Sequence, residues 1–172
     1  MRNSLGDAGV EVVMKSLGES NSLLELGLSG NSIGKVGAAH IAQILKSCPN
    51  LASLDLDDNS LGDDGAEIIS KSVELSTSLV TLSFCNNCCT GRGVALLCKI
   101  ASKHPTLKHL YLRGNPIGQS AQGLASLIGV LRDGSSLKSL DLGVTSLGDE
   151  GLKAITMGLK GIEKLPRSIA LY

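Results

Sequence analysis

Aromatic residues are nearly absent from this sequence: among 172 residues there is no tryptophan, one phenylalanine and two tyrosines. A compact core normally takes much of its bulk from aromatic rings. Because 42% of the residues are still hydrophobic, the chain can form a core, but almost wholly from leucine, isoleucine, valine and alanine. Such a composition predicts thin, repeated layers in place of one bulky core.

Other absences narrow the function classes. No apolar run approaches the roughly 18 residues of a membrane span, and no basic segment leads into an apolar one, so we expect neither a transmembrane helix nor a signal peptide. The net charge of zero argues against a general nucleic-acid binder. The five cysteines are an odd number, which fits a reducing compartment, the cytoplasm or the nucleus.

Five segments of the sequence match one pattern, L-x-x-L-x-L-x-x-N-x-L, at all or most of its positions. The leucines at the fourth and sixth positions alternate with polar residues, which is typical of a strand with one buried face. Between these segments apolar residues follow helical spacing, as at Ile68, Ile69 and Val73. The copies begin, 28 residues apart except for a last spacing of 30, at Leu23, Leu51, Leu79, Leu107 and Leu137.

Each repeat is therefore expected to contain a strand, a turn, a helix and a return. A strand, a helix and a parallel strand form a right-handed crossover, and such units of constant length stack into a curved solenoid. The sequence predicts a single α/β solenoid, with parallel strands on its concave face and helices on its convex face. We divide it into a partial first repeat with a helix (1–22), five full repeats (23–50, 51–78, 79–106, 107–136 and 137–164) and a terminal strand or cap (165–172). The two extra residues of the longer repeat are expected in a bulge near 132–136.

The turn after each strand carries a polar residue at the ninth position. An asparagine there can bond the backbone of its own turn and of the next repeat, which forms a ladder of satisfied polar groups. Thr145 takes this place in the fifth copy, where we expect a weaker turn. Acidic residues such as Asp7, Asp63 and Asp149 open the helices, as the helix dipole favours. The predicted ladder consists of Asn31, Asn59, Asn87 and Asn115.

This pattern resembles the leucine-rich repeat family, and within it the ribonuclease-inhibitor-like class. The resemblance rests on the L-x-x-L-x-L-x-x-N core, the 28-residue period and helix segments such as residues 61–69. The uniform repeats look most similar to those of NOD-like receptors. Ran GTPase-activating proteins, tropomodulins and some axonemal proteins carry similar repeats. Because the first helix aligns with the middle of a repeat, we expect a fragment of a longer protein. The alternative is a natural N-terminus whose helix acts as a cap.

Cysteine and histidine offer little chemistry. Cys85 and Cys88 have the spacing of half a zinc site, but no second pair follows, so we expect no metal. Cys89 occupies a buried position of the repeat, while Cys85 is expected to point outward from its strand. His40 and His104 fall on the helix side, and the equivalent of His109 one repeat back is Thr81, not serine or cysteine, so we expect no nucleophilic catalysis. No phosphate-binding glycine motif occurs. We therefore predict a protein that is not an enzyme and has no cofactor.

The candidate binding surface is the inner curve, where the polar positions of the strands project. Five of its side chains are acidic and one is basic, so its net charge is −4, and the net charge of the rest of the chain is +4. This charge suits a basic protein partner, a helix or a small domain, although solvated strand faces also carry polar residues without any partner. The candidate partner-binding residues are Glu25, Asp55, Asp57, Asp58, His109, Tyr111, Arg113 and Asp141.

The leading hypothesis is a non-enzymatic protein-interaction scaffold that binds neither nucleic acid nor membrane. The resemblance adds two further hypotheses. One is a regulator of a small GTPase, as in Ran GTPase-activating proteins, although their acidic tail has no counterpart here. The second is a ligand-sensing or autoinhibitory segment of a NOD-like receptor, which would require a nucleotide-binding domain upstream.

Overall fold

The computed structural model describes residues 3–117, 120–132, 136–160 and 166–171. Within these residues helices and strands alternate along the chain. The helices are α1 (Gly6–Leu17), α2 (Lys35–Ser47), α3 (Gly62–Val73), α4 (Gly91–Lys103), α5 (Ala121–Arg132) and α6 (Gly148–Gly158). The strands are β1 (Glu25–Gly27), β2 (Ser53–Asp55), β3 (Thr81–Ser83), β4 (His109–Tyr111), β5 (Ser139–Asp141) and β6 (Ser168–Ala170).

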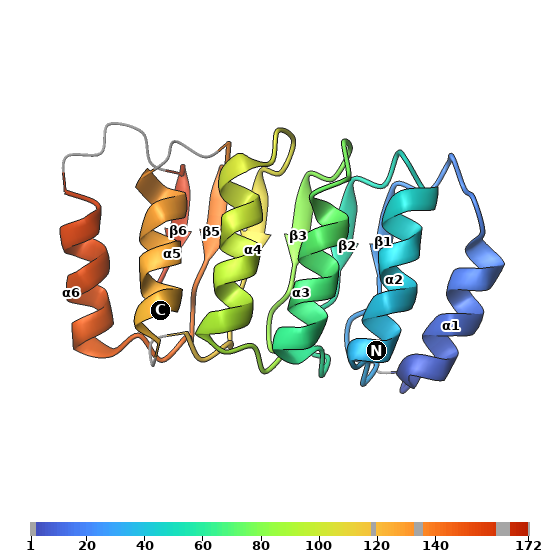
Figure 1. Cartoon of the computed structure of the whole chain (residues 1–172), viewed down its shortest axis with the longest axis horizontal. Helices are drawn as coiled ribbons and strands as arrows, with labels where there is room; N and C mark the ends of the chain where they lie inside the picture. Colours follow the sequence, from blue (N-terminus) through green and yellow to red (C-terminus); the bar gives the residue numbers. More distant parts are fainter. Residues whose placement is uncertain (1–2, 118–119, 133–135, 161–165, 172) are drawn as a thin grey trace.

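The six strands form one parallel sheet in sequence order, β1 to β6. Each strand pairs with the equivalent residues of the next, so that Leu26, Leu54, Leu82, Leu110 and Leu140 lie in one row. The helices lie side by side in a layer on one face of the sheet, from α1 at one end to α6 at the other (Figure 1). This arrangement confirms the predicted α/β solenoid. No helix among the described residues is long and apolar enough to cross a membrane.

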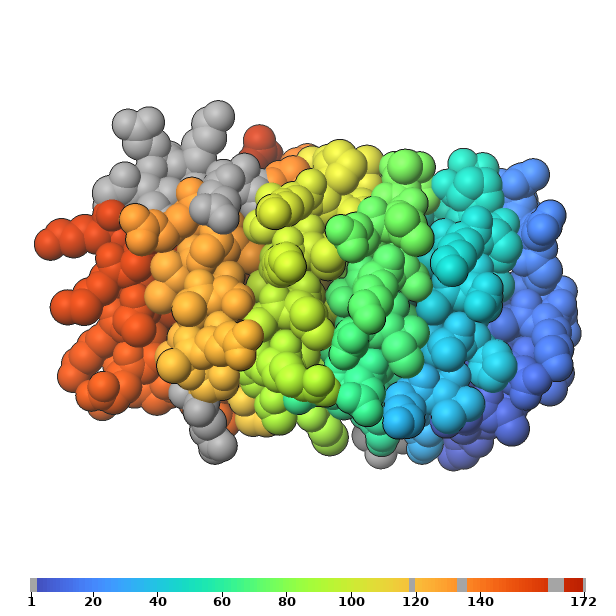
Figure 2. Space-filling model, in the orientation of Figure 1, coloured from blue at the N-terminus to red at the C-terminus, as the bar shows by residue number. Residues whose placement is uncertain are grey.

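The core consists of thin layers of aliphatic side chains between the strands and the helices. At the sixth position of the repeat, Leu56 and Leu112 are fully buried, and Phe84 takes the same place between them without becoming exposed. A single large ring can therefore replace a leucine in one layer, where neighbouring repeats leave it the room. The helices lie side by side and cover the face of the sheet opposite the strands' exposed side (Figure 2).

The helices begin in two ways. Before α1, α3 and α6 a leucine in helical conformation is followed by a glycine with positive φ, as at Gly62 (φ +58°). By contrast, α2 and α4 begin after an extended residue, Gly34 or Thr90. These two helices receive an acidic side chain from the preceding repeat. Asp63 Oδ1 accepts hydrogen bonds from the backbone N–H groups of Thr90 and Gly93, each at 2.9 Å.

This contact explains why residue 93 is a glycine. A Cβ atom at Gly93 would lie 2.5 Å from Asp63 Oδ1 and 3.1 Å from its Cα, and Gly37 faces Asp7 in the same way. Asp7 Oδ1 in turn accepts a hydrogen bond of 2.7 Å from the backbone of Gly34. The acidic residues at the helix starts therefore bind the next repeat, in addition to their favourable place in the helix dipole.

The expected bulge near residues 132–136 is wrong, and residues 133–135 of that segment lie outside the described part. Cys89 and Ile117 occupy equivalent positions in neighbouring repeats and are 28 residues apart. The next pair of equivalent positions, the buried glycines Gly93 of α4 and Gly123 of α5, is 30 residues apart. The same offset of 30 relates Leu127 to Leu97, both buried. The two extra residues therefore lie between Ile117 and Gly123, where the chain enters α5.

The last strand, expected within residues 165–172, forms as β6, one residue out of register with a motif copy that begins at Leu165. A motif copy that starts at Leu165 would place Ser168 at a buried leucine position. In the structure Ser168 pairs with Ser139, and Ile169 pairs with Leu140. The copy thus starts one residue later, at Pro166, and Ile169 supplies the apolar side chain that packs against the core.

Candidate functional site

The side chains that project from the strand side of the solenoid form what we call the concave surface. In β2 to β5 the central residue of each strand is buried and the residues on either side are partly exposed. The sheet register therefore brings five of the eight predicted partner-binding residues to one face, in rows one strand apart, and the other three follow in the turns after β2 and β4. The five in strands are Glu25, Asp55, His109, Tyr111 and Asp141, and the three in turns are Asp57, Asp58 and Arg113. They differ, however, in how freely their side chains are available.

Asp57 is bound into the fold. Its Oδ1 accepts a hydrogen bond of 2.6 Å from Ser83 Oγ and one of 2.7 Å from the backbone N–H of Cys85, both in the next repeat. Burial raises the pKa of Asp57, although these two hydrogen bonds act in the opposite direction. A side chain held in this way joins two repeats, so a partner could reach it only in part.

Asp55 and Asp141 occupy the same position of their repeats, and each accepts a hydrogen bond from the backbone two residues later. Asp55 Oδ1 accepts a hydrogen bond from the backbone N–H of Asp57 at 3.0 Å, and Asp141 Oδ1 accepts one from Gly143 at 2.8 Å. Each carboxylate thereby shapes the turn that follows its strand. Both remain partly exposed, so their second oxygen faces the concave surface.

Glu25 and Asp58 are the most accessible acids of this surface. Both are exposed, and for Glu25 no hydrogen bond of the side chain occurs among the described residues. Asp58 Oδ1 accepts an exposed hydrogen bond of 2.9 Å from Asn86 Nδ2. The two carboxylates lie on the first two rows of the sheet, so the acidic part of the concave surface is at the β1–β2 end.

The β4 row has a different character. The rings of His109 and Tyr111 are stacked, with centroids 6.4 Å apart and an angle of 18° between their planes. His109 Nδ1 lies 3.1 Å from Ser139 Oγ, which fixes the imidazole against the next strand. Arg113 follows in the same row, partly exposed. An aromatic pair and a guanidinium thus lie beside Asp141 of β5 and are separated from the acidic β1–β2 end by the β3 row. Such residue types are favoured in the centres of protein interfaces.

The asparagines of the predicted ladder are buried and hydrogen-bonded between repeats. Asn115 Oδ1 accepts from the backbone N–H groups of Asn87 and Cys89, at 3.1 and 3.0 Å, while its Nδ2 donates to the carbonyls of Phe84 and Leu112. Asn59 bonds the turn of Asn31 in the same way. These side chains hold the turns together and are not available to a partner.

Four of the five cysteines are buried, and Cys88 is the exposed one. Cys85 lies with its Sγ 3.8 Å from Ser83 Oγ, on the outward side of the strand where its position in the motif predicts it, but neighbouring side chains leave it only 8% exposed. Burial raises the pKa of Cys85 to about 12 and that of Cys98 to about 12, which leaves both as neutral thiols. Cys89 is fully buried, as predicted. Among the residues that the structure describes, no cluster of potential metal ligands occurs.

Sequence reasoning missed the charged cluster at the start of α3 and α4. Arg92 lies 2.8 Å from Asp64 and 3.5 Å from Asp63, on the outer side of the helices. Thr90 Oγ1 donates a hydrogen bond of 2.6 Å to Asp63. The spacing of 27 to 29 residues between these partners is close to the repeat length, and this was the available signal.

A comparison with protein-family models identifies leucine-rich repeats at residues 19–42, 47–70, 103–120 and 135–155, together just over half of the sequence. The chain belongs to the leucine-rich repeat family. A comparison with curated protein sequences finds no significant match.

Solved structures show the same fold at low sequence identity. A structure of leiomodin-1, described as its actin-binding site 2, is 14% identical, with a TM-score of 0.69 over 87% of this chain and 85% of that one. The C-terminal domain of tropomodulin from Caenorhabditis elegans is 16% identical, with a TM-score of 0.70 over 88% of this chain and 91% of that one. These likenesses establish a shared leucine-rich repeat architecture.

Proposed function

We propose that this leucine-rich repeat protein is a non-enzymatic interaction scaffold that binds a basic segment of a protein partner on its concave surface. The observation that carries the proposal is the concentration of acidic side chains there, −4 on the concave surface against +4 on the rest of the chain. A surface of one sign attracts partners of the other sign and orients them before contact. The free cysteines fit a reducing compartment, such as the cytoplasm.

The partner would make two kinds of contact. Basic side chains would meet Glu25 and Asp58, the exposed carboxylates of the first two rows. An apolar or aromatic side chain of the partner would pack on the His109–Tyr111 stack, next to Arg113. Asp55, Asp57 and Asp141 would contribute charge, while their hydrogen bonds to the backbone keep the surface rigid.

A fluorescent hexalysine peptide tests the charge complementarity directly. The Glu25→Gln/Asp58→Asn variant should bind it about fivefold more weakly at low salt, since two exposed ion pairs are together worth about 1 kcal/mol. Fluorescence anisotropy measures the affinity. Asparagine also tolerates the positive φ of residue 58 (φ +53°), so this variant leaves the turn intact.

The matched control is Glu19→Gln/Glu150→Gln, which removes the same charge from exposed sites outside the concave surface. Its affinity for hexalysine should stay within about twofold of the original chain. Equal losses in the two double variants would mean that net charge alone attracts the peptide, and the concave surface would then have no special role.

Actin is a second candidate partner, because the leiomodin-1 domain that shares this fold is described as an actin-binding site. Co-sedimentation with filamentous actin tests it: the chain should pellet with filaments, and Tyr111→Ala should reduce the pelleted fraction. A chain that stays in the supernatant at all actin concentrations removes this candidate. A role as a GTPase regulator or as a segment of a NOD-like receptor is supported only by the resemblance of the repeats.

A further inference from the structure

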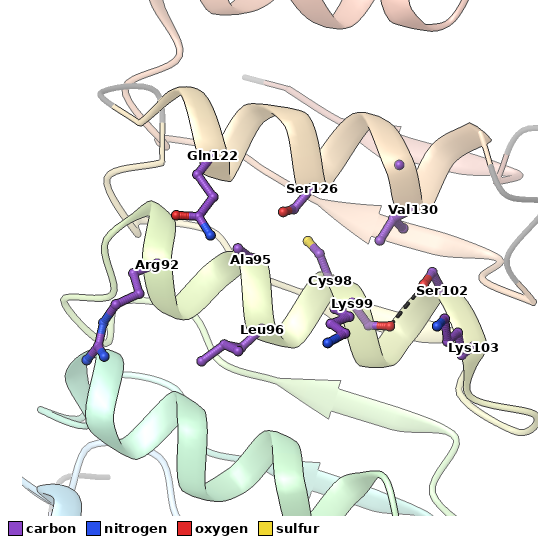
Figure 3. A pocket seen from close by; sticks show the side chains of 11 residues that line it. Arg92, Ala95, Leu96, Cys98, Lys99, Ser102, Lys103, Gln122, Ser126 and Val130 are labelled. Carbon is purple, nitrogen blue, oxygen red and sulfur yellow. Dashed lines mark hydrogen bonds between the residues drawn. The ribbon is translucent and has the colours of Figure 1, made fainter.

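A groove of about 390 Å³ runs between α4 and α5 on the outer face of the solenoid, away from the concave surface. Figure 3 shows the two helices side by side, with Lys99, Ser102 and Lys103 on α4 and Gln122 and Ser126 on α5 along the groove. The buried side chains Ala95, Cys98 and Val130 form its floor. The groove therefore has an apolar base and a polar rim.

Gly129 keeps the groove open. It lies inside α5, and a Cβ atom added there would meet no other atom within 4 Å. No close contact and no positive φ therefore requires glycine at this position, although glycine inside a helix costs roughly 1 kcal/mol relative to alanine. The equivalent residues of the neighbouring helices are the large Lys99 and Met157. The small residue leaves space that a partner can fill.

The charge around the groove has one sign. The two helices that form it, α4 and α5, carry four basic side chains and no acidic one. Arg92, at the start of α4, is already paired with Asp64 at 2.8 Å. The unpaired positive charge therefore resides further along the helix, at Lys99 and Lys103.

Lys99 differs from its equivalents in other repeats. Lys15 and Lys71 occupy the same row, and each is paired with a glutamate one turn earlier, Glu11 at 2.6 Å and Glu67 at 2.8 Å. Four residues before Lys99 the chain has Ala95 instead, which lines the groove. Within the described part of the chain, no carboxylate lies within 4.0 Å of Lys99 or Lys103. Glu74 lines a neighbouring hollow with both lysines but pairs with neither.

The polar rim offers hydrogen-bond donors as well as charge. The side chains of Gln122 and Ser126 face the groove, and neither has a hydrogen-bond partner among the described residues (Figure 3). Lys99 and Lys103 are one helical turn apart, so their ammonium groups can meet two carboxylates about 6 Å apart. None of the described residues that line the groove is aromatic, which disfavours the base stacking that single-stranded nucleic acids use.

We propose that the α4–α5 groove is a docking site for an acidic segment of a protein partner, whose carboxylates pair with Lys99 and Lys103 above the space left by Gly129. This site goes beyond the concave surface, because it lies on the other face and selects the opposite charge. A scaffold with both sites can hold a basic segment and an acidic segment at the same time.

A fluorescent hexaglutamate peptide tests the docking site on the full chain by anisotropy at low salt. Lys99→Glu/Lys103→Glu should weaken its binding about tenfold or more, because two attractive pairs become repulsive. The control Lys46→Glu/Lys71→Glu makes the same charge change on α2 and α3 and should weaken it about threefold at most. Gly129→Leu leaves the charge unchanged but fills the groove, and it should weaken binding about fivefold. Because leucine favours helix over glycine, this variant is expected to fold, which circular dichroism checks.

Three outcomes would overturn the proposal. The first is no binding of hexaglutamate at low salt. The second is an equal loss in the two lysine variants, which would indicate diffuse attraction. The third is full binding by Gly129→Leu, which would mean that surface charge acts without the groove. Tighter binding of a single-stranded oligonucleotide than of hexaglutamate would also exclude an acidic protein segment as the preferred ligand. Hexalysine binding, measured on the same variants, reports separately on the concave surface.

Discussion

The turns after β4 and β5 stand at equivalent places in neighbouring repeats, yet they are held very differently. In the first, Asn115 bonds four backbone groups, three in the strand-turn segment of the preceding repeat and one in its own. In the second, Thr145 donates one hydrogen bond of 2.7 Å to the carbonyl of Leu142, within its own turn. The Asn115 side chain joins two repeats, whereas the Thr145 side chain bonds only within its own turn. The interaction between neighbouring repeats should therefore be weaker at β5 than at β4.

Replacing the two residues by alanine is the strongest way to test this difference. Asn115 is fully buried, so Asn115→Ala should cost roughly 3 to 5 kcal/mol, since it leaves several buried backbone groups without partners. Thr145→Ala should cost only about 1 kcal/mol, the worth of one hydrogen bond. Urea denaturation followed by circular dichroism measures both. Similar losses for the two variants would show that the asparagine does not link the repeats energetically.

The acidic residues at the helix starts provide a second comparison between the middle and the end. Asp63 is partly buried and binds the backbone of the next repeat at Thr90 and Gly93. Asp149 opens α6 in the same way but is exposed, and it has no such contact among the described residues. Asp63→Ala should therefore cost about 2 kcal/mol, as for the loss of a strong helix cap, and Asp149→Ala less than about 0.5 kcal/mol. The same denaturation experiment checks both values.

The pH dependence of the Asp63 effect follows from its ionisation. Burial opposes the charged form, but hydrogen bonds from Thr90, Gly93 and Arg92 outweigh it and lower the pKa of Asp63 below its usual 3.8. A carboxylate with a lower pKa in the folded state contributes stability above pH 3.8 and loses it as the pH falls through the folded value. The difference in the free energy of unfolding between the original chain and Asp63→Ala should become smaller as the pH falls below 3.8. A difference that stays constant over this pH range would contradict the role of the charge.

The sequence predicted the fold because each repeat is specified locally. The leucines of the motif, the asparagines and the helical spacing recur at one period over most of the chain, so the register of the first five strands follows once the first copy is aligned. The entry into α5 was misplaced because the position of Gly123 in the repeat is shown only by packing. A Cβ atom at Gly123 would come close to Ile117 Cγ2, just as one at Gly37 would come close to Ile33 Cγ2. The start of the last copy was misplaced because neither Leu165 nor Pro166 completes the motif. Such positions are fixed by packing, which leaves no periodic signal.

The candidate sites were predicted less completely than the fold. Alternation along the strands places Glu25, Asp55 and Tyr111 on one face, and this could be deduced from the motif alone. The hydrogen bonds of Asp57 to Ser83 and Cys85 could not be deduced in this way, because these partners lie one repeat away and the contacts depend on side-chain rotamers. The α4–α5 groove was missed because it depends on an omission, a glycine where other helices have a long side chain.

A smaller difference between the middle and the end concerns the backbone of the turn. The residues after the strands that have positive φ are, in order along the repeats, Gly30, Asp58, Asn86, Gly114 and Val144. The first four are residue types that tolerate this conformation, whereas valine is β-branched and is disfavoured there. Val144 has a φ of +54° and is 63% exposed, so it gains little burial to offset the strain.

Val144→Asn should therefore stabilise the chain by about 1 kcal/mol, because asparagine accepts this conformation at lower cost. The reciprocal change, Asn86→Val, places valine in the equivalent turn between β3 and α4 and should destabilise by a similar amount. Thermal and urea denaturation of both variants give the two values. If Val144→Asn loses stability, the exposed side chain must be supported by contacts at the β5 end that offset the strain. The two ends of the solenoid would then differ less in cohesion than the asparagine ladder implies.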